Sequence, residues 1–599
     1  MSTPSTAPSW RHCAHGADAT SDPVGCRGVH VAGHTACLAH LADADRDAYL
    51  ANLTPGASID HRGTTFTDSL LTTLLDALQD PETGEARLGT AMFWQAIFEG
   101  SAGFNSVTFE GDAVFREATF EGYTTFESAI FEHTAMFDSA TFEGDAVFWG
   151  AAFRGETFFQ SCTFAGGFAA FGETSFGQVA IFRHAAFKSD VGFREATFKG
   201  YAQFGGATFE NDVVFWGTTF EDDASFWSAT FVKADQFGPA VCAGQVVLSG
   251  AVFGGPVTLS FAARRLECRR TRWSQTAEIR LRFATVDFAH AVFEYPLTIA
   301  AEPSPFVLSD GRPLAENRLP STYDLGVRVA SLRGVDAAHL VLADLDLSGC
   351  LFAGTVHLDQ LRLEGACTFD TAPPAVHWRR WSPVRFTARR VLAEEHHWRA
   401  SQPGAVRGWN VAVLGAGRAG PLQLAPVYRA LRKAFEDGKH EPGAADFYYG
   451  EMEMRRHADD IPRSERGLLT AYWALSGYGL RASRALAWLG AAMLLTIVLL
   501  MAFGLAQEPP KQTATGTVPA GGGKVTFEID KDDPQNPTGN RFTGERFEKA
   551  LNVTINSVVF RSSDQDLTTA GTYIEMTSRL TEPVLLGLAV LAVRNRVKR

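Results

Sequence analysis

The most regular pattern of hydrophobic positions in the chain is a series of phenylalanines spaced alternately five and six residues apart over residues 93–164. The series slips by one residue at Phe171 and then continues to Phe237. A small residue often stands two positions before the phenylalanine, as Ala113 does before Phe115. A repeat of fixed period indicates a solenoid, in which each repeat packs only on its neighbours.

The composition of the repeat distinguishes a helix from a strand. An 11-residue period also suits a helix of about 3.67 residues per turn. Glycine, however, recurs near one phase of the repeat, as at Gly100, Gly111 and Gly122. Glycine costs about 1 kcal/mol in a helix interior, whereas threonine and phenylalanine favour strands. We therefore predict short extended segments joined by corners, with each phenylalanine pointing inward and stacking on its copy one coil away. The core residues that this predicts include Phe109, Phe115, Phe120, Phe126, Phe131, Phe137, Phe142 and Phe148.

The repeats resemble a known family. Residues 118–122 (Ala-Thr-Phe-Glu-Gly) resemble pentapeptide repeats of the Phe-centred kind, and residues 343–347 (Ala-Asp-Leu-Asp-Leu) resemble the more usual Leu-centred kind. The resemblance implies a right-handed quadrilateral β-helix in which four five-residue sides make one coil. The alternation of five and six departs from that pattern, so we expect an extra residue at a corner and about 22 residues per coil. At roughly 4.8 Å per layer, residues 93–237 would form about six or seven coils.

The rest of the chain divides into segments of different composition. Whether residues 238–330 continue the solenoid is left open. In the Trp/Arg-rich segment, arginine packing on tryptophan is preferred to a nucleic-acid or lipid-headgroup surface. The expected segments are 1–60 (Cys/His cap module), 61–90 (helical cap), 91–240 (Phe-centred repeats), 241–370 (irregular continuation and second repeat block), 371–420 (Trp/Arg-rich cap), 421–480 (helical hairpin and pre-membrane linker) and 481–599 (membrane domain).

The net charge of −13 is concentrated in the repeats, because residues 93–237 hold 20 acidic and 7 basic side chains. A solenoid needs a polar surface, so a solvated acidic face is the simplest interpretation. Gyrase-protecting members of the resembled family suggest an alternative, a DNA-mimicking rod. In either case this surface would repel nucleic acid, and direct nucleic-acid binding is not expected.

The N-terminal forty residues hold a candidate metal site. Cys37 and His40 have the C-x-x-H spacing with which two ligands share one tetrahedral ion. Cys13 and Cys26 would complete a Cys₃His site for structural zinc, with a nearby histidine as a substitute. The first two cysteines lack the short loop of a zinc knuckle, so free buried cysteines and redox chemistry remain as alternatives. A bound zinc ion would pin a small cap ahead of the solenoid.

The C-terminal part predicts two membrane spans. Residues 485–506 carry no charge over a length that crosses a hydrocarbon core of about 30 Å. Arginines precede this stretch, and a basic tail follows a second expected span at 573–593. The positive-inside rule therefore places the solenoid and the C-terminal tail in the cytoplasm, at the cell (inner) membrane, with 507–572 as an extracytoplasmic loop. The alternative is a single span followed by an interfacial helix, since only residues 584–593 of the second stretch are continuously apolar.

The second span carries three ionisable residues, Glu575, Arg579 and Glu582, on one helical face. Together with the semi-apolar segment 551–560, the two spans distantly resemble the two-helix pore domain of potassium channels. The segment Ser557-Val-Val-Phe-Arg561-Ser-Ser-Asp564 lacks the T-V-G-Y-G type of selectivity filter. In an oligomer the three ionisable residues are candidates for a pore lining; the alternative is an ion-pair ladder within the helix.

These features predict a non-enzymatic integral membrane protein. No nucleophile with a base or paired acid/base residues is assembled in the sequence. The glycine motif at 415–420 is followed by Pro421 and helical patterns, not by a dinucleotide-binding βαβ unit. Residues 448–456 resemble the pre-membrane segment of membrane-bound pentapeptide-repeat proteins of actinobacterial type. The expected function is scaffolding of an unidentified protein partner at the membrane, with a channel-like homo-oligomer and a gyrase-directed DNA mimic as alternatives.

Overall fold

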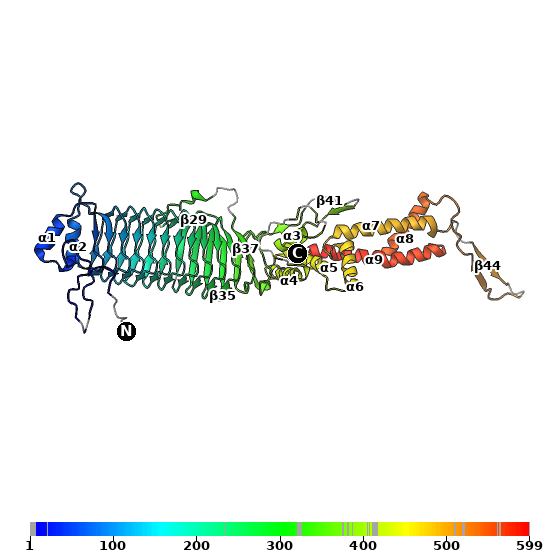
Figure 1. Cartoon of the computed structure of the whole chain (residues 1–599). Helices are drawn as coiled ribbons and strands as arrows, with labels where there is room; N and C mark the ends of the chain where they lie inside the picture. Colours follow the sequence, from blue (N-terminus) through cyan, green and yellow to red (C-terminus); the bar gives the residue numbers. More distant parts are fainter. Residues whose placement is uncertain are drawn as a thin grey trace. The chain divides into compact units, whose positions relative to one another are not determined.

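The computed structural model contains a parallel β-solenoid of about 12 turns, and the phenylalanine repeats form its regular part (Figure 1). This confirms the predicted fold class. The chain forms two compact units, unit 1 (residues 1–419 and 433–438) and unit 2 (residues 420–432 and 439–599). The structure describes residues 7–18, 20, 22–233, 235–308, 310–319, 326–373, 376–379, 382–385, 387–403, 405–406, 408–409, 417, 419–507, 511–517, 521–559, 561 and 565–597. Residues 415, 416 and 418 of the glycine motif, Trp381 of the Trp/Arg-rich segment, and residues 560 and 562–564 of the filter-like segment lie outside these residues.

Three parallel sheets run along the solenoid. One sheet contains β2 (Thr65–Thr67), β4 (Ile97–Glu99), β8 (Thr119–Phe120), β12 (Thr141–Phe142), β16 (Thr163–Phe164), β20 (Ala186–Phe187), β24 (Thr208–Phe209), β28 (Thr230–Phe231), β30 (Val252–Phe253), β32 (Arg272–Trp273) and β35 (Val292–Phe293). A second contains β5 (Ala102–Gly103), β9 (Thr124–Thr125), β13 (Ala146–Val147), β17 (Phe168–Ala170), β21 (Asp190–Gly192) and β25 (Val213–Val214).

The third sheet supplies the two remaining sides. Its strands are β1 (Ala57–Asp60), β3 (Arg87–Met92), β6 (Thr108–Phe109), β7 (Ala113–Val114), β10 (Ile130–Phe131), β11 (Ala135–Met136), β14 (Ala152–Phe153), β15 (Thr157–Phe158), β18 (Ser175–Phe176), β19 (Ala180–Ile181), β22 (Thr197–Phe198), β23 (Ala202–Gln203), β26 (Thr219–Phe220), β27 (Ala224–Ser225), β29 (Gln236–Val247), β31 (Val257–Glu267), β33 (Ala277–Arg282), β34 (Thr285–Asp287), β36 (Leu297–Ala301), β37 (Arg328–Ser331), β38 (Leu340–Ala343) and β39 (Arg362–Glu364).

Each coil has four sides. The strands β10, β11, β12 and β13 follow one another along the chain and pair with β14, β15, β16 and β17 of the next coil. Ile130 pairs with Thr108 on one side and with Ala152 on the other, which fixes the coil at 22 residues. Tight corners contain a non-glycine residue in the left-handed conformation, such as Ser106 or Glu117. These tight corners lie in the five-residue steps, so the extra residue of the six-residue steps lies in the wider corners.

The phenylalanines form ladders inside the solenoid. The eight core residues expected from the sequence are fully buried. Phe98 and Phe120 stack with ring centroids 4.7 Å apart and ring planes 3° apart, and Phe120 stacks in turn on Phe142 at 4.6 Å. Ala118 and Ala140 fill the interior between them and are also fully buried. Apolar burial and aromatic stacking therefore repeat from coil to coil along the whole series.

The described residues between 238 and 330 continue the solenoid, because β29, β31, β33, β34 and β36 pair in parallel and β37 pairs with β34 beyond an insertion. The slip in the phenylalanine series is absorbed between Ala165 and Phe168, where the pairing offset increases from 22 to 23 residues. Farther along, Val252, Arg272 and Val292 are paired partners at offsets of 20 residues. The irregular sequence therefore reflects shorter coils.

Unit 1 departs from the regular coils in two places. An insertion between β36 and β37 packs Phe306, Leu314 and Leu319 against Val241 and Ala262 on the solenoid side. In the segment 61–90, expected to form a helical cap, the helix spans only α2 (Asp68–Asp76), because residues 87–92 pair as β3 with neighbouring strands. The other short elements of unit 1 are η1 (Leu38–His40), α1 (Asp43–Ala51), η2 (Glu316–Arg318), η3 (Leu358–Gln360), α3 (Ala393–Ala400), and the antiparallel pairs β40 (Asp370–Thr371) with β43 (Arg390–Val391) and β41 (Val376–Arg379) with β42 (Ser382–Arg385).

The helix α3 follows the last coils and carries buried charge. Glu395 is fully buried and accepts hydrogen bonds from Arg389 and Arg399, each at 2.6 Å. The guanidinium of Arg399 lies over the rings of Trp398 and Trp409 at 5.4 and 5.0 Å. Arginine thus packs on tryptophan in the Trp/Arg-rich segment.

The remaining part of the chain is mainly helical. Its elements are α4 (Pro421–Asp437), α5 (Glu441–His457), α6 (Arg463–Ser476), α7 (Ala482–Leu499), the π-helical turn η4 (Leu500–Gly504), the hairpin β44 (Gln512–Gly516) and β45 (Phe527–Lys531), α8 (Gly544–Val558) and α9 (Thr569–Val597). The stretches Ala482–Gly504 and Thr569–Arg594 are long and apolar enough to cross a membrane, with mean hydropathies of 2.4 and 1.4. They correspond to the two spans expected from the sequence.

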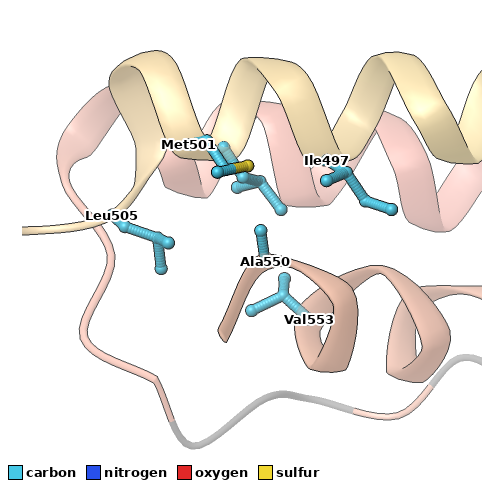
Figure 2. Packing of buried hydrophobic residues seen from close by; sticks show 6 residues of the cluster. Ile497, Met501, Leu505, Ala550 and Val553 are labelled. Carbon is cyan, nitrogen blue, oxygen red and sulfur yellow. The ribbon is translucent and has the colours of Figure 1, made fainter. Parts of the chain in front are cut away.

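The helix α8 packs against the end of the first long helix. Ala550 and Val553 of α8 contact a cluster that contains Ile497, Met501 and Leu505 (Figure 2). The sequence predicted only a semi-apolar stretch here, and its amphipathic spacing is realised as a helix.

Candidate metal centre and membrane-domain charges

Backbone pairing brings the first two predicted ligands together. The amide of Cys13 donates to the carbonyl of Gly28 at 2.8 Å, and the amide of Ala14 donates to the carbonyl of Cys26 at 2.8 Å. Ala14 and Gly25 adopt left-handed conformations, which lets the chain reverse tightly between these segments. The two cysteines are 13 residues apart in sequence but adjacent in the fold.

The other two predicted ligands lie on one helical turn. The 3₁₀ turn η1 begins directly after Cys37, and the amide of His40 donates to the carbonyl of Cys37 at 3.0 Å. Residues three apart on such a turn lie on the same side, so both side chains point toward the same point.

The four ligand atoms form a compact cluster. The Sγ atoms of Cys26 and Cys37 are 3.6 Å apart, and Nδ1 of His40 lies 3.3 Å from Sγ of Cys37 and 3.7 Å from Sγ of Cys13. All four atoms lie within 4.8 Å of one another. A tetrahedral ion with metal–sulfur bonds of about 2.3 Å places its ligands roughly 3.5–3.8 Å apart. These residues can therefore hold a metal ion, and a sulfur–sulfur distance of 3.6 Å is far too long for a disulfide.

The surroundings of the cluster restrict its ligands. Cys37 is fully buried, whereas the other three are partly exposed. The ring of His15 stacks on that of His40 at 4.1 Å, so His15 lies beside the cluster and outside the four-ligand set. A Cβ atom added at Gly28 would lie 2.5 Å from Cβ of Cys37, which no real structure tolerates. Sequence reasoning did not single out Gly28, because its role depends on how close the two segments come in the fold.

Two of the thiols interact with each other. The hydrogen bond between the Sγ atoms of Cys26 and Cys37 lowers the pKa of Cys26 to about 5 despite its partial burial. The same hydrogen bond and burial raise the pKa of Cys37. Thiolate is the form of cysteine that binds metals, so Cys26 already presents the chemistry that a metal requires.

The cluster is tied to the first coil of the solenoid. The amide of Val29 donates to the carbonyl of Arg62 at 2.8 Å. The guanidinium of Arg62 lies 5.1 Å from the ring centroid of Trp10 and binds Asp60 through both carboxylate oxygens. The indole of Trp10 in turn donates to the carbonyl of Arg27 at 2.9 Å. The position of the candidate metal centre is thus set by the edge of the first coil.

The three ionisable residues of the second apolar helix divide into a pair and a single residue. Arg579 donates to Glu575 at 2.7 Å within α9. Glu582 is fully buried and accepts a hydrogen bond from Thr496 of α7 at 2.8 Å. Two of the three residues therefore form an intrahelical ion pair, and the third joins the two long helices.

Comparison with known proteins identifies the repeats. The family model described as pentapeptide repeats, in nine copies, matches residues 104–152, 171–219, 182–230 and 193–241. These residues lie in the regular part of the solenoid, so the predicted resemblance to the pentapeptide-repeat family is confirmed. Comparisons with curated proteins and with solved structures gave no match.

Proposed function

We propose that this pentapeptide-repeat protein is a non-enzymatic scaffold that is anchored in a membrane and holds a partner protein on its solenoid. The observation that carries the proposal is the union in one chain of a continuous β-solenoid and two helices of membrane-spanning length. A stack of coils offers a long surface of fixed geometry, which suits binding better than catalysis. The two apolar helices would keep that surface at the membrane.

The charge distribution supports a cytoplasmic solenoid. Six arginines lie between residues 455 and 484, before or in the first turn of the first long helix, and four basic residues lie between 594 and 599, at and beyond the end of the second. Basic residues close to membrane spans remain on the cytoplasmic side. Both termini would then lie in the cytoplasm, with residues 507–568 on the opposite side of the cell (inner) membrane.

The Cys₃His cluster supports a structural zinc ion. Four protein ligands fill a tetrahedral zinc sphere, whereas catalytic zinc sites retain an open position. The chain's own residues would hold the ion between Cys13, Cys26, Cys37 and His40 and so fix the N-terminal segment on the first coil. Bound zinc would contribute to the stability of this end of the solenoid.

Membrane extraction and tag accessibility test the anchorage. The protein should stay in the membrane pellet after an alkaline carbonate wash, whereas a variant ending at residue 481 should not. An epitope tag inserted at 521–523 should be reached by antibody in intact spheroplasts, and a tag at the C-terminus only after permeabilisation. Release of the full chain by carbonate, or the reverse pattern of tag access, would refute this topology.

The packing of α8 favours a second candidate function, a channel-like oligomer. Its buried face contacts the end of the first span, as a short helix between two membrane helices would in a pore domain. Conduction requires a ring of subunits. A monomer or dimer in detergent, measured by light scattering with the detergent mass subtracted, would exclude it. A larger ring whose ion flux in liposomes is lost on Glu575→Gln and Glu582→Gln exchange would support it over the scaffold.

A further inference from the structure

A groove of about 1210 Å³ follows one corner of the solenoid over its later coils. The corner residues of successive coils stack in a column through their backbones. The amide of Gly250 donates to the carbonyl of Arg269, that of Arg270 to Ala289, and that of His290 to Arg333, at 2.7–3.0 Å. The groove extends from Trp227 to Gly354. Six coils contribute to it, which corresponds to about 24 Å at roughly 4.8 Å per layer.

The groove carries an excess of positive charge. Four arginines line it, whereas its only acidic lining residues are Glu267 and Asp287. Both acidic side chains already bind Arg269, at 3.3 and 2.8 Å. Arg265 and Arg270 are exposed and, among the residues that the structure describes, have no ion-pair partner. Arg333 adds a further guanidinium two coils beyond Arg270.

Small residues keep the corner open between these arginines. Ser249 and Gly250 precede Arg269 and Arg270 in the column, and Ala353 with Gly354 closes it. In earlier coils the same column contains Gly205 with Gly206 and Arg183 with His184, and Arg116 lies 3.6 Å from Asp138. The four arginines that line the groove all belong to the later coils.

We infer that this groove binds an extended acidic segment of a partner protein. Guanidinium groups recognise carboxylates through paired hydrogen bonds, and their spacing along the column suits a linear ligand. About seven residues of extended peptide span 24 Å. A longer polyanion such as duplex DNA would meet the acidic coils 93–237, which hold 20 acidic and 7 basic side chains. Trp227, which is 57% exposed at one end of the groove, offers an apolar contact for a flanking residue of the peptide.

This inference rests on the proposed scaffold function and adds that the partner binds through an acidic segment. It is tested with the full chain in detergent micelles and a fluorescein-labelled octaglutamate peptide, measured by fluorescence anisotropy at low salt. Arg265→Glu with Arg270→Glu should weaken binding at least about tenfold, because each exchange replaces attraction by repulsion. Arg264→Glu is the matched control: Arg264 is the exposed neighbour of Arg265 but does not line the groove, and its exchange should change affinity less than about twofold.

The outcomes separate the alternatives. No binding of the peptide by the wild-type protein, or equal loss in the Arg264→Glu control, would overturn the proposal. Tighter binding of a duplex DNA oligonucleotide with the same dependence on Arg265 and Arg270 would overturn it in favour of nucleic acid. Unchanged thermal unfolding of all variants would show that the fold is intact. Arg270→Gln removes the positive charge without adding a negative one and so provides a milder exchange. Carbonate extraction reports on the membrane anchor alone, so failure of peptide binding and failure of anchorage are distinguishable.

Discussion

Oε1 of Glu394 lies 2.6 Å from the backbone nitrogen of Phe352 and accepts its hydrogen bond. The same oxygen accepts the amide of Ala353 at 2.9 Å. Glu394 belongs to α3 and is 1% exposed, and burial raises the pKa of its carboxyl group. The final coil of a solenoid has amides that no further coil can pair, and a buried unpaired amide is costly. The carboxylate of Glu394 therefore accepts the hydrogen bonds that the backbone of a further strand would otherwise accept from the last coil.

Removing this side chain should loosen the end of the solenoid. Glu394→Ala leaves two amides without an acceptor and should lower the free energy of unfolding by about 2–3 kcal/mol. Hydrogen exchange should become faster at Phe352 and Ala353 while amides near β12 are unaffected. Glu394→Gln keeps the acceptor oxygen and should lose less. Equal exchange rates in Glu394→Ala and wild type would contradict the capping role.

Truncation of a ladder residue should be costly. Phe148 stacks on Phe126 and Phe171 at 5.0 and 4.8 Å and is fully buried. Phe148→Ala removes both stacks and creates a cavity, which should destabilise the solenoid by about 3–5 kcal/mol. Phe168 is 41% exposed on the surface of the same region, so Phe168→Ala should cost less than about 1 kcal/mol. Chemical denaturation of the two variants would measure the contrast, and similar losses would argue against the ladder as the main source of stability.

The first coil should be sensitive to acid through His61. This fully buried residue occupies the ladder position taken by Phe93 in the next coil, and burial lowers its pKa to about 4. An unfolded histidine titrates near 6.5, so the unfolded chain binds a proton first as the pH falls. Stability should therefore be constant above about pH 6.5 and decrease by about 3 kcal/mol as the pH falls to 4.

His61→Phe provides the matched test of this pH dependence, because it extends the phenylalanine ladder and removes the titrating group. Thermal unfolding of the N-terminal coils should then lose the component of acid sensitivity between pH 6.5 and 4. If the variant and the wild type lose stability in parallel over this range, another group is responsible.

Metal content should depend on the four clustered ligands. The purified protein should contain about one zinc ion per chain by elemental mass spectrometry, and Cys26→Ser with Cys37→Ser should contain none. Gly28→Ala should lower the metal content without changing a ligand, because its Cβ would displace Cys37. Cys367→Ser, a half-buried cysteine far from the cluster in sequence, is the control and should keep the metal. Zinc that persists in the double variant would assign it to another site.

Close contact of two glycines should determine how the two apolar helices pack. A Cβ at Gly571 would lie 2.2 Å from the carbonyl oxygen of Gly504, whereas a Cβ at Gly587 would meet nothing within 4 Å. Gly571→Ala should separate the helices and lower the midpoint of thermal unfolding in detergent, while Gly587→Ala, also on α9, should not. An unchanged midpoint in Gly571→Ala would show that the helices are not held at this point.

The sequence predicted those parts of the fold that follow from the regular spacing of its repeats. Coil length and the inward phenylalanines follow from local spacing, and the C-x-x-H pair predicted the metal cluster for the same reason. The ladder position of His61 could not be found in this way, because the helix α2 interrupts the period before Phe93. Glu394 and Gly28 act through contacts with residues distant in sequence, 42 residues away for Glu394 and Phe352, and no local pattern reports such contacts.

The 22-residue pairing offset has a consequence for the length of the protein. Each coil contacts only the coil before and the coil after it, and equivalent residues in neighbouring coils are interchangeable. Loss of 22 consecutive residues from the regular region would bring matching side chains into contact and shorten the solenoid by a single layer of about 4.8 Å. Loss of 11 would keep every phenylalanine inside but rotate all later faces to the opposite side. Duplication or deletion of 22-residue segments in the gene can therefore lengthen or shorten the solenoid by whole coils. The structures that cap its two ends would not change.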